Sequence, residues 1–176
     1  MRTSHSSRTS HSSRLAPAPA TMLAIVTLLL STVASADSAS GTVFYQSKVG
    51  PITVNVKNVY LVKGPDAMAG KSIRRLIFTS ADLGDKIKAC GNMSCSDNDL
   101  REGLEVNLDS GPRMTYWFVG NGQRVQYSGT AQQATLKLTT DTPQQLAGKL
   151  TIDDSGAGGP QTDIDFDATM LKEFAK

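Results

Sequence analysis

Apolar and polar residues alternate along several short segments of the chain, in the period-2 pattern that is typical of half-buried strands. The segment 52–62 places Ile52, Val54 and Val56 on one face, with polar residues between them. Segments 41–47 and 72–79 are rich in β-branched, aromatic and aliphatic residues, and similar segments follow between residues 102 and 169. The pattern therefore predicts a mainly β protein.

One segment departs from this alternation and has the spacing of a short helix. Leu83, Ile87 and Cys90 recur at i, i+4 and i+7, and Ser80 precedes them as a candidate N-cap, which predicts a helix over 81–90. Strands and helices do not alternate regularly, so a parallel α/β sheet is not expected. The expected fold is an antiparallel β-sandwich or barrel of about eight strands with one short helix.

The first 36 residues have the features of a signal peptide. An apolar run between residues 22 and 30 precedes Ala34-Ser35-Ala36, a small-x-small cleavage site. The run is too short for a membrane span, which needs about 20 apolar residues. We therefore expect export to the periplasm or the extracellular space after cleavage near Ala36, and a single mature domain over 37–176.

Cleavage changes the composition of the chain. It removes 36 of 176 residues, including both histidines, His5 and His11, and three of the 18 basic residues. The mature chain then has 140 residues, with 15 basic against 16 acidic residues and a formal charge of −1. The loss of histidine excludes His-dependent triads and metal sites, and the near-neutral charge gives no electrostatic footprint for nucleic acid.

Cys90 and Cys95 are the two cysteines of the chain, with four residues between them. Two thiols without histidine cannot assemble the usual zinc ligand set, and the spacing is not that of a C-x-x-C redox pair. In an exported protein a structural disulfide is expected, which would tie the end of the helix to the following loop.

An aromatic hairpin at 113–128 supplies the candidate binding residues. If Asn121 and Gly122 form a two-residue turn, Trp117 faces Gln126 and Val119 faces Arg124 on one surface. The opposite surface would then belong to the core, with Tyr116, Phe118, Val125 and Tyr127.

Trp117, Arg124 and Gln126 together would form a platform for a sugar ring or for a partner protein, because Trp and Arg are favoured interface anchors. Two alternatives place the indole in the core instead. Trp117 either packs beneath the helix at 81–90, or a three-residue turn shifts the register and buries it.

The last predicted strand carries Asp163, Asp165 and Asp167 on one face, opposite Ile164 and Phe166. Calcium accepts oxygen ligands alone, but the glycine and the terminal glutamate of an EF-hand loop are missing from this segment. We expect a solvated acidic strand face, and neither a metal site nor a cofactor.

The sequence contains no catalytic motif such as G-x-S-x-G or S-x-x-K. It favours a non-catalytic binding or interaction module with a carbohydrate or protein partner. A structural or envelope accessory protein without a small ligand is the alternative, and a small carboxylate-dependent hydrolase is the third hypothesis. An exposed Trp117 would support the first hypothesis over the second, and a facing pair of buried carboxylates would support the third.

Overall fold

The structure is a computed structural model that describes residues 37–66 and 70–175. The predicted signal peptide and its cleavage site lie outside the described residues. In chain order the elements are β1 (Ser38–Ser47), β2 (Gly50–Val56), β3 (Asn58–Pro65), β4 (Ser72–Thr79), α1 (Gly84–Ala89), the 3₁₀ helix η1 (Met93–Asn98), β5 (Gly103–Asn107), β6 (Arg113–Gly120), β7 (Val125–Gln132), the 3₁₀ helix η2 (Gln133–Thr135), β8 (Leu136–Asp141), β9 (Gln145–Leu150), the 3₁₀ helix η3 (Ser155–Ala157) and β10 (Gln161–Glu173).

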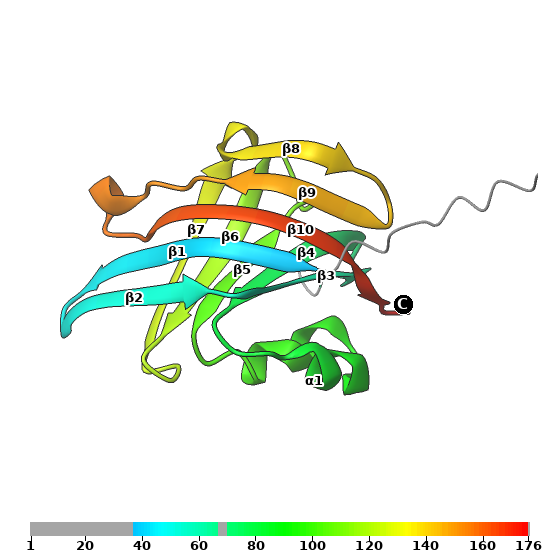
Figure 1. Ribbon diagram of the computed structural model, residues 1–176, viewed down its shortest axis with the longest axis horizontal. Helices are drawn as coiled ribbons and strands as arrows, with labels where there is room; N and C mark the ends of the chain where they lie inside the picture. Colours follow the sequence, from blue (N-terminus) through cyan, green and yellow to red (C-terminus); the bar gives the residue numbers. More distant parts are fainter. Residues whose placement is uncertain (1–36, 67–69, 176) are drawn as a thin grey trace, which may run out of the picture. The chain divides into compact units, whose positions relative to one another are not determined.

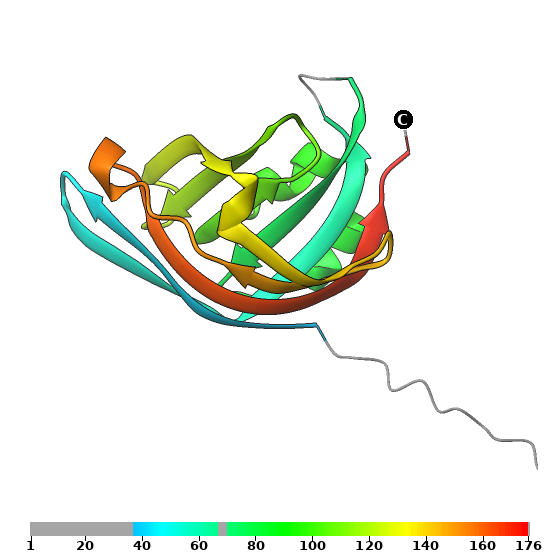
Figure 2. The same cartoon turned by 90° about the horizontal axis from the view of Figure 1, so that it is seen from above.

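The strands form one curled mixed sheet, which confirms the mainly β prediction (Figures 1 and 2). Its main path runs β2-β1-β10-β3-β4-β5-β6-β7, and β9 joins β10 to β8. The long strand β10 pairs with β1 and β9 along its first part and with β3 near its end. The β3–β10 pairing is parallel, whereas the other strand pairs of the described residues are antiparallel.

The sheet has ten strands rather than about eight, and one of the additional strands arises because the predicted strand 52–62 is divided at Lys57 into β2 and β3. β2 pairs with β1, whereas β3 pairs with β4 and β10. Val56 and Val59 both belong to the same core cluster although they are three residues apart. A continuous strand would place them on opposite faces, so the break at Lys57 is what lets both side chains reach that core.

Two apolar cores lie on the two faces of the central strands. The larger core fills the inside of the curl and includes the fully buried Leu76, Leu104 and Phe118. The smaller core lies on the other face, where α1, η1 and their flanking loops cover the sheet with Leu83 and Ile87 among others. β4 contributes to both cores, which explains its nearly continuous run of buried residues.

The predicted helix exists but is shorter than expected. α1 spans Gly84–Ala89, and Leu83, Ile87 and Cys90 are buried as the spacing predicted. Ser80 is not its N-cap, since the helix begins after Leu83. The chain before the helix is fixed by Asp82, whose Oδ1 accepts hydrogen bonds from the Gly84 amide at 2.9 Å and from the Tyr60 hydroxyl at 2.6 Å. No helix in the described part of the chain is long and apolar enough to cross a membrane.

A tyrosine cluster closes one end of the larger core. The hydroxyl groups of Tyr116 and Tyr127 both donate hydrogen bonds to Oδ2 of Asp154, in the loop before β10. The ring of Tyr116 lies against Gly129, the residue directly opposite on β7, where a Cβ atom would collide with it. The small residue at 129 therefore lets the ring cover the strand and reach Asp154.

Candidate functional site

A groove of about 510 Å³ lies on the face of β4–β7 that also carries the smaller core. Most of its lining comes from directly paired positions, which form two rows across the strands. The rows are Glu105, Trp117 and Ser128 in one, and Arg75, Asn107, Thr115 and Thr130 in the other. Asp97 of η1 completes the lining beside them.

A buried ionic cluster forms part of this groove. The Arg75 guanidinium donates from Nε to Oδ1 of Asn107 at 2.7 Å and from Nη1 to Oδ1 of Asp97 at 2.8 Å. The same Nη1 lies 3.3 Å from Oε2 of Glu105. Only 7% of Arg75 and 4% of Glu105 are exposed to solvent, so two ionisable side chains have been taken out of water.

Burial raises the pKa of Glu105 to about 8, because desolvation and the neighbouring Asp97 together outweigh the attraction of Arg75. Burial also raises the pKa of Asp97. Among the described residues, no group donates a hydrogen bond to Oε1 of Glu105. The raised pKa favours the protonated form of Glu105 near neutral pH, beside Asp97 and a single guanidinium.

Trp117 lies at this groove and is half-buried. Part of its indole packs against the smaller core, which α1 and η1 cover, and part lines the groove. The position of Trp117 thus combines features of the predicted platform and of the predicted core position. The indole supports the packing near the helix and also presents a surface to the groove.

The predicted pairing of the aromatic hairpin is wrong by two residues. Trp117 lies opposite Ser128 and Val119 opposite Gln126, because the turn contains the four residues 121–124 rather than two. A shift of two residues preserves the faces of a strand. Tyr116 and Phe118 accordingly belong to the larger core, as predicted, and Trp117 lies on the other face.

The longer turn is held by Gln123, whose φ of 74° is in the left-handed region. Its side-chain amide nitrogen lies 3.0 Å from the carbonyl oxygen of Asn98 and 2.7 Å from that of Leu100, and its backbone amide donates to Arg101. These bonds fix the turn to the end of η1. They offset the strain of a positive φ at a residue other than glycine.

Arg124 and Gln126, the other two predicted binding residues, do not line the groove. Arg124 is an exposed turn residue. Gln126 is exposed on β7, and its side-chain amide donates to the carbonyl oxygen of Gln123 at 3.2 Å. The structure brings Trp117 together with Arg75, Asp97 and Glu105 instead, and the sequence-based prediction contained none of these three.

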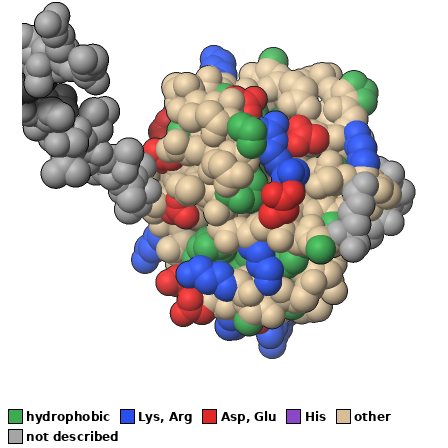
Figure 3. Space-filling view, turned by 90° about the vertical axis from the view of Figure 1, so that its right-hand side faces the viewer, with side chains coloured by type: hydrophobic (Ala, Val, Ile, Leu, Met, Phe, Trp, Pro, Cys, Tyr) green, Lys and Arg blue, Asp and Glu red, His purple; other side chains and the backbone are tan. Residues whose placement is uncertain are grey.

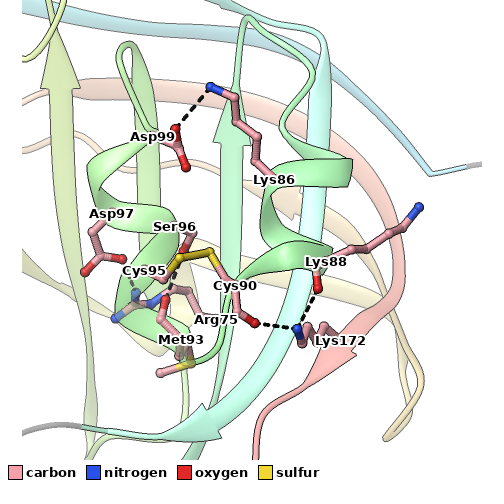
Figure 4. Close-up of a disulfide and its surroundings, with 10 residues drawn as sticks. All are labelled: Arg75, Lys86, Lys88, Cys90, Met93, Cys95, Ser96, Asp97, Asp99 and Lys172. Carbon is pink, nitrogen blue, oxygen red and sulfur yellow. Dashed lines mark hydrogen bonds and ion pairs between the residues drawn. A yellow bond between two sulfur atoms is a disulfide. The ribbon is translucent and has the colours of Figure 1, made fainter.

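The predicted disulfide between Cys90 and Cys95 is present, with its Cα atoms 5.6 Å apart. It joins the end of α1 to η1, so that Asp97 follows the second cysteine by two residues and reaches Arg75 (Figure 4). Lys172 of β10 donates to the carbonyl oxygens of Lys88 and Cys90 and so caps the end of α1 (Figure 4). The disulfide therefore helps to position a residue of the groove.

The aspartates of the acidic strand β10 contact polar side chains of the neighbouring strand β9. Lys149 of β9 lies 2.6 Å from Asp163 and 3.6 Å from Asp165, and Asp167 accepts a hydrogen bond from Gln145 at 2.7 Å. Within residues 37–66 and 70–175, no group of three or more His, Cys, Asp or Glu residues is placed to hold a metal ion.

Surface charges elsewhere are also interspersed. On the face seen in Figure 3, basic and acidic side chains lie close together, without a large patch of either sign. Arg74, for example, lies 2.9 Å from Asp109 and 2.6 Å from Asp141. The groove differs from this surface because Arg75 and Glu105 are buried there, and two carboxyl groups lie beside one guanidinium.

Comparison of the chain with protein-family models, with curated proteins and with solved structures finds no match. The interpretation of the groove therefore depends on its own geometry and chemistry.

Proposed function

We propose that the protein is an exported, non-catalytic binding module whose ligand site is the groove on β4–β7. The observation that carries this proposal is the buried Arg75–Glu105–Asp97 cluster beside the half-exposed indole of Trp117. Buried ion pairs contribute little net stability, and perturbed carboxyl groups concentrate at functional sites. A cluster of this kind in an open groove is better explained by recognition than by support of the fold.

The accessory-protein hypothesis predicts that the groove has no ligand. Trp117 does not decide the question by itself, because it is neither fully exposed nor fully buried. The buried Oε1 of Glu105 favours the binding hypothesis, because it has no hydrogen-bond partner among the described residues and a purely structural surface gains nothing from such an oxygen.

The carboxyl pair also bears on the hydrolase hypothesis. Glycosidases hold their two carboxyl groups about 5–5.5 Å or 6.5–9.5 Å apart, so that a sugar or a water fits between them. Asp97 and Glu105 contact the same nitrogen of Arg75, Nη1, at 2.8 Å and 3.3 Å. This arrangement leaves no room for a substrate between the two groups, and we therefore favour binding over hydrolysis.

An NMR screen of small polar compounds, including saccharides and amines, tests the proposal. We expect hits to shift the backbone amides around Trp117, Ser128 and Thr130, and Ser128→Phe to abolish binding by filling the groove. Gln126→Phe is the matched control, because it adds the same ring to β7 outside the groove. A screen whose hits cluster on another surface, or which finds none, would refute the groove as a ligand site.

A further inference from the structure

The groove holds two carboxyl groups and one guanidinium. The charged side chains that act on Glu105, among those the structure describes, are Arg75 and Asp97. With both carboxyl groups ionised, the cluster has two negative charges and one positive charge. The protein meets this excess by holding a proton, as the raised pKa of Glu105 indicates. One further positive charge in the groove would neutralise the cluster without that proton.

The groove also has the other features that an organic cation requires. Asp97 keeps 29% of its side chain exposed, so its carboxylate is open to direct pairing with a ligand. Trp117 adds an aromatic surface, which attracts ammonium and guanidinium groups through cation–π interaction. The hydroxyl groups of Thr115 and Ser128 can accept hydrogen bonds from the remaining N–H groups of the ligand.

Other ligand classes fit less well. An anion would add negative charge beside Asp97 and Glu105. A divalent metal ion such as calcium needs about six to eight oxygen ligands. The residues that line the groove include two carboxyl groups, and the positive charge of the Arg75 guanidinium lies beside both of them. A neutral polyol could form hydrogen bonds but would leave the charge excess and its proton in place.

We infer that the groove binds an organic cation, a primary ammonium or guanidinium group that pairs with Asp97, lies against Trp117 and supplies the second positive charge beside the two carboxyl groups. This inference rests on the proposed function and specifies its ligand class. Binding at neutral pH then ionises Glu105 and transfers its proton to the buffer, so association releases close to one proton per ligand.

The test compares n-butylamine with the neutral n-butanol, and methylguanidine serves as a second cation. Binding is followed by NMR and by the fluorescence of Trp117, the single tryptophan of the chain. Calorimetry at pH 7 in two buffers of different ionisation enthalpy counts the protons released. We expect the amines to bind with proton release, whereas butanol and a simple saccharide do not bind.

Two variants separate the cluster from general electrostatics. Glu105→Gln should weaken amine binding about tenfold or more and abolish the proton release. Glu102→Gln makes the same charge change at an exposed position outside the groove and should change neither quantity. A lysine-containing tripeptide with blocked termini distinguishes the source of the cation. Tighter binding than butylamine indicates a side chain of a protein partner, and equal binding indicates a free amine.

The inference is overturned if butanol or the saccharide binds as well as butylamine, or if amine binding releases no proton and is unaffected by Glu105→Gln. In both cases a ligand still shifts the groove residues, so the proposed function survives. If no probe of any class perturbs the groove, the proposed function fails together with the inference.

Discussion

Glu105 should make the stability of the protein fall as the pH rises through neutrality. Its carboxyl group has an ordinary pKa of 4.5, and burial raises the pKa to about 8 in the folded protein. Between these values the folded chain holds a proton that the unfolded chain has lost. The stability due to this proton is fully present below about pH 4.5 and is lost as the pH rises through about 8.

The size of the effect follows from these two pKa values. One pKa unit corresponds to about 1.4 kcal/mol, so Glu105 should lower the free energy of unfolding by about 2 to 3 kcal/mol between pH 5.5 and pH 7.5. Glu105→Gln has nearly the same shape and cannot ionise, so it removes this dependence. Asp97 retains its contact with Arg75 in the variant.

Urea unfolding at pH 5.5, 6.5 and 7.5, followed by circular dichroism, measures the difference between the two proteins. We expect the wild-type curve to fall relative to that of Glu105→Gln, with the variant gaining in relative stability as the pH rises. Glu102→Gln should run parallel to wild type, since its side chain is exposed. Parallel curves for wild type and Glu105→Gln would mean that Glu105 is ionised in the folded protein, and the argument for a proton held by Glu105 would fail.

Three further changes test the packing around the groove. Replacing Cys90 and Cys95 together by alanine should cost about 2 kcal/mol of stability, as expected for so short a loop, measured by urea unfolding under non-reducing conditions. Phe118→Ala should cost about 3–5 kcal/mol because the ring is fully buried, and Trp117→Ala should cost less; the reverse order would show that the indole is mainly structural. Tyr116→Phe should lower the thermal midpoint by an amount equivalent to about 1–2 kcal/mol through the lost bond to Asp154, and an unchanged midpoint would show that this bond is not needed.

The faces of the strands could be predicted from the sequence, but their pairing could not. Alternation alone places the side chain of Trp117 on the opposite face of the strand from those of Tyr116 and Phe118. The two cores confirm this, because Tyr116 and Phe118 belong to the larger core and Trp117 packs against the smaller one. The pairing depends on the length of the turn, which Gln123 sets through bonds to carbonyl groups of residues 98 and 100. A contact between segments more than 20 residues apart leaves no local pattern that could reveal it.

The groove itself was hidden by the same alternation that predicted the strand. Glu105 alternates with Leu104 and Val106, which is the pattern of a strand with one face in solvent. That face is covered here by η1, so the polar positions become buried. The one local signal is the pair Arg74 and Arg75, which interrupts the apolar segment 72–79; Arg75 is the one of the two that lies on the covered face. A charged residue there needs a buried partner as soon as the strand is covered on both faces.

The segment that carries Asp97 is restrained from three sides. The disulfide joins it to α1, the side-chain amide of Gln123 binds its carbonyl groups, and Arg75 holds its carboxylate. Each restraint comes from a different element, and together they fix one partly exposed carboxylate next to Trp117. If this segment served only to cover the smaller core, its apolar residues would have to be held in place, but the carboxylate of Asp97 would not. Fixing a charged side chain before a ligand arrives lowers the entropic cost of binding, which is the advantage that a recognition site gains from such support.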